Sequence, residues 1–301
     1  MDHWDEVRTA YHVARLGTVS GAAEILGVHH ATVIRHVDAL EERLGVKLFQ
    51  RHARGYTPTE AGRDLLQVAQ ATEDQLNQLA GRIKGRGDTV SGELVVTSVA
   101  ALTGWLTPIL AGFQRANPEV SVRLLSDARL FRLEYGEAHV AVRAGSPPDQ
   151  PDNVVQRLAE AESALYGSRE YLARYGHPTS EEELAGHRFV GIDPASPAAR
   201  SPSATWTSSL ASRGRIVFQT SDERAIVEAT VEGAGLGLLG VLDGAQYPEL
   251  VQVLQPREEW RARFWLVTHV DLHRTPKVQA LLKALKAGAR ETAERGPGLI
   301  L

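Results

Sequence analysis

Apolar residues near the start of the chain recur at helical spacing and predict two helices joined by a tight turn. The second helix runs from about His29 to Leu44, because four apolar residues share one of its faces: Val33, Val37, Leu40 and Leu44. The first helix is short: Ser20 is placed to cap it, and Gly27 can adopt the left-handed conformation that ends it. The pattern is that of a helix-turn-helix.

The opposite face of the second helix is polar, and its polar residues gather near the helix start: His29, His30, Thr32, Arg35 and His36. Such a face suits a recognition helix, whose N-terminal residues meet base edges in a DNA groove. A metal site at the three histidines is less favoured, because no carboxylate or thiol completes a ligand set. We therefore predict that these five residues and Ser20 bind double-stranded DNA.

A hairpin and a long helix are predicted next. Leu48 and Phe49 would anchor the hairpin, Gly55 would form its turn, and Arg51 and Arg54 would lie near the DNA phosphates. The segment Thr57-Pro58-Thr59-Glu60 fits a capping box with proline at the first helical position.

The long helix carries a heptad seam of six residues: Leu65, Ala69, Thr72, Leu76, Leu79 and Ile83. We expect the same helix of a second subunit to pack on this seam, with Leu65, Thr72, Leu76, Leu79 and Ile83 as dimer contacts. The alternative is that the helix packs only on its own domain.

Beyond a glycine-rich break at residues 85–92, strands alternate with helices, which predicts parallel pairing with right-handed crossovers. Strands are expected at residues 93–97, 120–125, 139–143, 189–192, 215–220 and 250–254. Helices are expected at residues 106–116 and from Thr275-Pro276 onward. Residues 288–301 show no clear pattern and are predicted to be disordered.

Composition narrows the class of protein. A chain of 301 residues with 43% hydrophobic content is expected to form two or more domains. Because the sequence has no cysteine, disulfides and thiol chemistry are excluded. No signal-like segment or 18-residue apolar run is present, so we expect a cytoplasmic protein that does not span a membrane. The net charge of −4 conceals a basic stretch between Arg43 and Arg54.

The N-terminal part resembles LysR-type transcriptional regulators. The matching segments are Gly17-Thr-Val-Ser-Gly-Ala-Ala-Glu, Leu40-Glu41, Leu44-Gly-Val-Lys-Leu-Phe49, Arg51 and Thr57-Pro-Thr-Glu-Ala-Gly62. The resemblance implies an all-α winged helix-turn-helix (1–57), a linker and dimerisation helix (58–85) and a hinge (86–92). It further implies an α/β two-lobed domain like periplasmic binding proteins (93–287), followed by a tail (288–301). Lobe 1 would comprise residues 93–165 and 267–287, and lobe 2 residues 166–266.

The resemblance also implies a function. The protein would be a transcription regulator that binds DNA as a dimer or a dimer of dimers, with RNA polymerase as a further candidate partner. A small-molecule effector, expected to be anionic, would bind between the lobes, and no other cofactor is expected. The family often carries serine where this chain has Ala31 and Ile34, and proline where it has Gly240, so contacts at these positions do not carry over.

Candidate effector residues lie where strands end and helices begin, since ligands of such folds bind there and helix N-termini favour anions. They are Ser98, Val99, Ala100, Ser126, Arg143 and Thr220. We expect Ser98 and Thr220 to donate hydrogen bonds and Arg143 to clamp a carboxylate. Alternatively, Ser98 and Ser221 cap helices, and Arg143 pairs with an acidic residue across the lobes.

Other patterns are interpreted as structural. Gly235-Leu-Gly-Leu-Leu-Gly240 matches a dinucleotide-binding pattern but follows a predicted helix, whereas a phosphate loop follows a strand. His269 and His273 flank Asp271 and are predicted to lie at the surface. No catalytic motif is recognised, so an enzyme is not expected. The competing class is a solute-binding protein without a DNA function.

Overall fold

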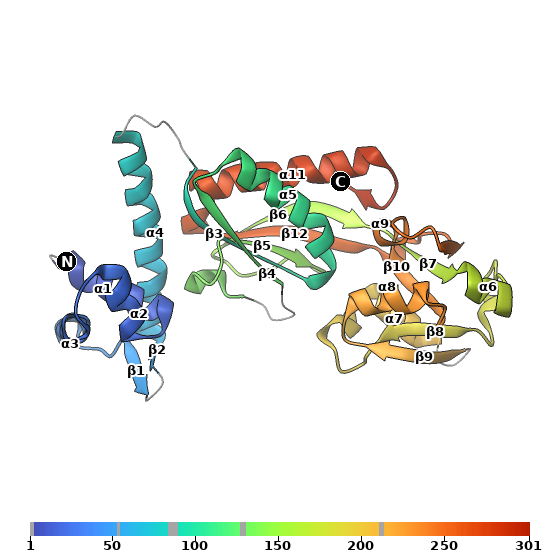
Figure 1. Ribbon diagram of the computed structural model, residues 1–301, viewed down its shortest axis with the longest axis horizontal. Helices are drawn as coiled ribbons and strands as arrows, with labels where there is room; N and C mark the ends of the chain where they lie inside the picture. The colour runs from blue at the N-terminus through green and yellow to red at the C-terminus, as the bar shows by residue number, and fades with distance from the viewer. Residues whose placement is uncertain (1–2, 53–54, 84–89, 127–130, 211–213) are drawn as a thin grey trace.

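The computed structural model describes residues 3–52, 55–83, 90–126, 131–210 and 214–301. The chain forms an N-terminal helical domain, one long helix and two α/β lobes (Figure 1). This confirms the predicted fold class. No described helix is both long and apolar enough to cross a membrane.

The N-terminal domain consists of three helices and a two-stranded hairpin: α1 (Trp4–Leu16), α2 (Val19–Leu26), α3 (His30–Leu44), β1 (Phe49–His52) and β2 (Gly55–Pro58). Its core contains Ala10, Val13, Ala22, Val33, Val37, Leu40, Leu48 and Phe49, all buried. The helix-turn-helix is confirmed, and Gly27 ends α2 in the left-handed region with φ of +65°.

Two details of the helix-turn-helix differ from the prediction. Thr18, not Ser20, caps α2, because its hydroxyl accepts the Gly21 N–H at 3.2 Å while Ser20 lies exposed inside the helix. Leu44, expected to face inward, is 41% exposed. It is the last residue of α3, and the chain turns away from the core at Gly45, which has φ of +68°.

The long helix α4 (Glu60–Ile83) begins later than predicted. The Thr59 N–H donates to the Leu48 carbonyl at 2.9 Å, so Pro58 belongs to β2 and not to the first helical turn. The Thr59 hydroxyl accepts the Gly62 N–H at 3.2 Å and caps the helix. The predicted capping box with a proline start is therefore wrong.

Lobe 1 is a six-stranded sheet in the order β13–β6–β12–β5–β3–β4, with β3, β4 and β5 parallel and β12 antiparallel to both its neighbours. Its strands are β3 (Gly92–Ser98), β4 (Val120–Ser126), β5 (Val140–Ala144), β6 (Asn153–Ala161), β12 (Ala262–His269) and β13 (Leu299–Ile300). Its helices are η1 (Ala100–Leu102), α5 (Thr103–Ala116), η2 (Leu133–Tyr135), α10 (Val270–His273) and α11 (Pro276–Arg295). Apolar residues of the strands, α5 and α11 form one core.

Lobe 2 is a five-stranded sheet in the order β11–β7–β10–β8–β9. Its strands are β7 (Ser163–Ser168), β8 (Arg188–Ile192), β9 (Arg215–Thr220), β10 (Leu236–Gly240) and β11 (Leu250–Leu254). Its helices are α6 (Arg169–Tyr175), η3 (Glu182–Leu184), η4 (Pro197–Arg200), α7 (Pro202–Ser209), α8 (Glu223–Val231), α9 (Val241–Gly244) and η6 (Glu258–Trp260).

The C-terminal segment is ordered, so the predicted disordered tail is wrong. Helix α11 continues to Arg295, and β13 pairs with β6 through Leu299 and Ala161. The chain enters lobe 2 at Glu162 and returns to lobe 1 with Ala262, earlier than the predicted crossings near 166 and 267. Most of the predicted hinge lies outside the described residues, and Gly92 already belongs to β3.

Candidate DNA-binding and effector sites

The exposed side of α3 is the candidate DNA-binding surface. Val33 and Val37 fix the inward face, which leaves His29, His30 and Arg35 exposed near the start of the helix. Two of the predicted DNA contacts, Thr32 and His36, are less exposed than these three residues. Thr32 is half-buried, and Nδ1 of the half-buried His36 lies 3.0 Å from the Thr9 hydroxyl of α1. DNA binding by all of these residues stays a prediction.

The hairpin beside α3 is held by a buried carboxylate. Glu41 is 3% exposed and accepts the N–H groups of Leu48 at 2.9 Å and Phe49 at 3.2 Å. Its other oxygen lies 2.8 Å from Lys47 Nζ and 3.0 Å from the Arg51 guanidinium. Burial alone would raise the pKa of Glu41, but these hydrogen bonds hold it below its usual value.

Arg51 is therefore engaged within the protein. Its guanidinium also lies 2.5 Å from Asp38 and stacks over the Tyr56 ring at 5.3 Å. These contacts join the hairpin to α3, and the Arg51 side chain stays partly exposed. Its contact with a DNA phosphate stays a prediction. Arg54 lies outside the described residues.

The predicted seam of α4 divides in two. Leu65 packs against the core of its own N-terminal domain, as the alternative interpretation expected. Thr72 is half-buried and donates its hydroxyl hydrogen to the Val68 carbonyl at 2.8 Å, whereas Leu76 is 57% exposed and Val68 is 64% exposed. The side chains of Leu79 and Ile83 lie outside the described part, so the dimer contacts stay a prediction.

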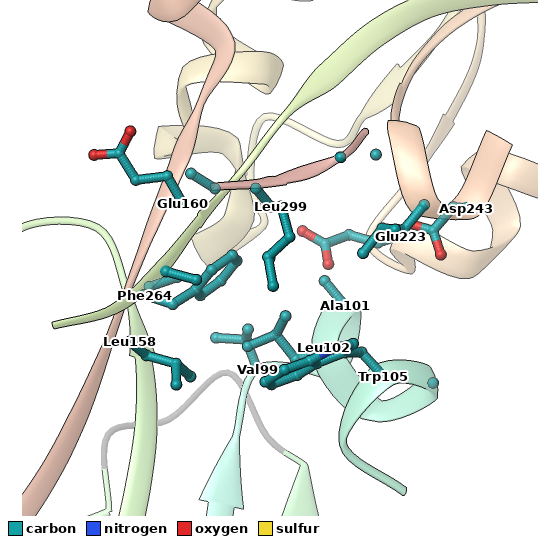
Figure 2. A pocket seen from close by; sticks show the side chains of 18 of the residues that line it. Val99, Ala101, Leu102, Trp105, Leu158, Glu160, Glu223, Asp243, Phe264 and Leu299 are labelled. Carbon is teal, nitrogen blue, oxygen red and sulfur yellow. The ribbon is translucent and has the colours of Figure 1, made fainter. Parts of the chain in front are cut away.

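A cavity of about 2050 Å³ lies between the lobes. Lobe 1 provides an apolar wall, and lobe 2 presents carboxylates from α8 and α9 (Figure 2). The wall includes Val99, Leu102, Trp105, Leu158, Phe264 and Leu299. Typical ligand pockets measure roughly 300–1,000 Å³, so a small ligand would fill only part of this cavity.

The polar side of the cavity is acidic. The Glu223 carboxyl faces Ala101 of lobe 1 (Figure 2), and its interaction with the Ala101 main chain by itself lowers its pKa. Burial and the nearby Asp243 and Asp222 raise the pKa of Glu223, and burial raises the pKa of Asp243. Eight acidic and five basic residues line the cavity among those described.

The structure brings three of the six predicted effector residues to the cavity: Val99, Ala100 and Ser126. Ser98 is buried and donates its hydroxyl hydrogen to the Val99 carbonyl at 3.1 Å. The Thr220 hydroxyl accepts the Asp222 N–H at 3.0 Å, and Asp222, not Ser221, caps α8.

Arg143 makes its described hydrogen bonds within lobe 1, and no described ion pair joins it to an acidic residue across the lobes. Its guanidinium donates to the Phe131 carbonyl at 3.0 Å and to Gln150 at 3.5 Å, all within lobe 1. It is absent from the described lining of the cavity. Effector binding by these residues stays a prediction.

Comparison with known proteins identifies the family. Residues 4–63 match the bacterial regulatory helix-turn-helix protein, lysR family, and residues 87–290 match the LysR substrate binding domain. The chain belongs to the LysR family. A transcriptional repressor of Pseudomonas aeruginosa strain UCBPP-PA14 is 30% identical over 62% of this chain and 59% of that protein. The regulator CrgA of Neisseria meningitidis serogroup B is 31% identical over 62% and 63% of the two chains.

The LysR-family fold is also seen in a solved structure. The structure of CrgA from Neisseria meningitidis has a TM-score of 0.57 and 25% identity, and it covers 94% of this chain and 97% of that chain. The sequence alignments, by contrast, span only about three fifths of each curated relative. The fold of nearly the whole chain is therefore similar to that of CrgA, while the sequence alignments with the curated relatives cover a smaller part of the chain.

Two site features of this LysR-family chain were missed from sequence. Glu41 was noted only as part of a matching segment, although its position one residue after the inward-facing Leu40 places it beside the core. The second is Glu223, which neither the hydroxyl pattern nor Arg143 indicates. Its position in the first turn of α8, just after Asp222, could have indicated an acidic cavity rim.

Proposed function

We propose that this protein regulates transcription by binding double-stranded DNA through α3 and that a small molecule in the interlobe cavity controls this binding. The observation that carries the DNA part is the exposed polar half of α3, which projects from a core that fixes its orientation. The exposed Leu76 and Val68 on α4 support self-association through that helix, which would pair two DNA-reading domains.

The experiment is a mobility shift with footprinting on the upstream intergenic DNA of its own gene, across a salt series. A protected, two-fold-related site that outcompetes random DNA supports the regulator. Binding that is weak and disappears with added salt on every sequence argues instead for a cavity protein without a DNA function.

Arg35 provides the sharpest test of the DNA-binding surface. Replacing Arg35 by alanine is expected to weaken binding to the footprinted site by about 1–3 kcal/mol if the guanidinium contacts a base, with much less effect on random DNA. Arg290 is an exposed arginine of α11, and Arg290→Ala serves as the matched control. An equal loss on all sequences would reduce Arg35 to a phosphate contact, and no loss would remove it from the interface.

The charges of the cavity bear on the effector. The sequence predicts an anion, yet the Glu223 carboxyl already faces Ala101 in the cavity (Figure 2), and Arg143 is engaged elsewhere in lobe 1. An anion would have to displace the Glu223 carboxylate and approach Asp243. We therefore propose an effector with a positive or hydrogen-bond-donating group that faces these two carboxyls, and an apolar body against the Trp105 wall.

This ligand class is tested by thermal shift with pairs of amines and carboxylates of equal carbon skeleton. The amine of each pair is expected to raise the melting temperature more, and Glu223→Gln is expected to abolish that difference. Glu258→Gln, at an exposed position of the cavity lining, is the control. A larger shift with the carboxylates would instead favour the anionic effector.

A further inference from the structure

Two buried histidines lie at the edge of lobe 1 away from the cavity. His139 directly precedes β5, and His269 is the last residue of β12; their exposed fractions are 1% and 5%. The antiparallel pairing of β12 with β5 sets Val267 opposite Ala141. Continuing that register by two residues sets His269 opposite His139.

Each ring is oriented by a main-chain N–H group. Nδ1 of His139 accepts the Val95 N–H at 3.0 Å, and Nδ1 of His269 accepts the Asp271 N–H at 3.3 Å. A ring nitrogen that accepts a hydrogen bond carries no proton, so the neutral ring carries its proton on Nε2. Both rings therefore present an Nε2–H group.

The two Nε2 atoms face the linker helix α4 of the same chain. The side-chain amide of Gln67 lies 3.1 Å from His269 Nε2, and that of Gln70 lies 3.3 Å from His139 Nε2. Residues three apart share one face of a helix, so one face of α4 meets both rings. The amide nitrogen is the atom that faces each ring. A half-turn about the last side-chain bond exchanges it with the amide oxygen, which then accepts the Nε2–H hydrogen bond.

The segment before His139 is shaped for this contact. Gly136 ends η2 with φ of +65°, in the left-handed region, and a Cβ atom there would lie 2.9 Å from the Gln70 amide. A side chain at this position would be strained and would also crowd Gln70. Arg143 holds the beginning of the same segment through the Phe131 carbonyl.

The strands that carry the histidines also reach the cavity. Ala144, the last residue of β5, and residues 145–147 after it line the cavity, and so do Ala262 and Phe264 at the start of β12. From His139 to Ala144 the extended chain covers roughly 17 Å. One end of each strand thus borders the cavity and the other contacts α4.

We propose that Gln67, Gln70, His139 and His269 form a histidine latch that holds the linker helix against lobe 1 of its own chain. Through β5 and β12 the latch couples the cavity to the placement of the DNA-binding domain. Because coupling free energy is reciprocal, opening the latch must also change the cavity end of these strands. This inference rests on the proposed function in one respect, namely that a ligand binds in the cavity.

The test measures the placement of α4 without DNA or ligand. Because the chain contains no cysteine, Gln50→Cys in β1 and Ser121→Cys in β4, both exposed, can carry a pair of spin labels without background. Labelled chains are diluted with unlabelled chains, so that pulsed electron paramagnetic resonance reports the distance within one chain. Gln67→Ala with Gln70→Ala is expected to shift or broaden that distance distribution. Alanine favours the helix, so α4 itself should stay formed.

Gln279 gives a matched control. Its amide lies 3.3 Å from His273 Nε2, a glutamine–histidine contact that stays inside lobe 1. Gln279→Ala should leave the distribution unchanged. The same variants are compared by hydrogen exchange, where only the double variant should show faster exchange at residues 144–146 relative to β4.

An unchanged distribution in the double variant, or an equal change in Gln279→Ala, would overturn the latch. Unchanged exchange at residues 144–146 would overturn the coupling to the cavity. Failure of the DNA or effector experiments would leave both of these measurements standing, so the two proposals fail separately.

Discussion

Replacing Gly62 by alanine is expected to lower the free energy of unfolding of the N-terminal domain by about 3 kcal/mol. Gly62 lies in the first turn of α4, where a Cβ atom would stand 2.1 Å from the Leu48 carbonyl oxygen. That oxygen accepts the Thr59 N–H, so it cannot move without loosening the start of α4 from β1. Hydrogen exchange of amides in α1–α3 across a urea series measures this domain by itself.

Gly104→Ala is the matched control for this prediction. Gly104 is also a glycine in the first turn of a helix, but nothing described lies within 4 Å of the Cβ position. Alanine there should stabilise α5 by about 0.4–1 kcal/mol, because it restricts the unfolded chain and favours the helix. A Gly62→Ala protein as stable as the unmodified one would show that the contact between α4 and β1 yields easily.

Glu41→Ala is expected to cost about 3 kcal/mol of stability in the same domain and to loosen the hairpin. The substitution leaves the N–H groups of Leu48 and Phe49 without their acceptor in a buried place, and it removes the partner of Lys47 and Arg51. Urea unfolding with hydrogen exchange at β1 measures both effects. The neighbouring Glu42 is exposed, and Glu42→Gln should change stability by less than about 0.5 kcal/mol.

The Glu41 contribution depends on pH with a defined sign. Its pKa in the folded protein lies below the usual 4.5, so the folded state favours the charged form. The stabilisation is therefore complete above about pH 4.5 and is lost as the pH falls through the lowered pKa. The stability difference between unmodified protein and Glu41→Gln should shrink on acidification. A difference that stays constant down to low pH would show that the charge of Glu41 contributes nothing.

The sequence by itself determined those features that depend on local spacing. The positions of Val33, Val37 and Leu40 were sufficient to place α3 and its exposed face, because an inward stripe on a helix leaves only one outward side. Predicted strands matched β3, β4, β8, β9 and β11 within a residue or two, since short apolar runs bounded by turn residues have few alternatives. The segment 235–240 follows α8 and forms β10, as its setting after a predicted helix indicated. Gly237 lies where a Cβ atom would stand 2.2 Å from the Thr230 hydroxyl.

Only the tertiary structure decided which polar group meets which. His269 was expected at the surface, but the neighbouring strand and α4 bury it, and both are distant in sequence. Arg143 was expected to clamp a ligand, but the Phe131 carbonyl is its partner. Such hydrogen bonds and charge pairs form between groups that the packing of distant segments brings together. The spacing of residues within one segment therefore does not predict them. The cavity is decided in the same way, because residues of both lobes line it.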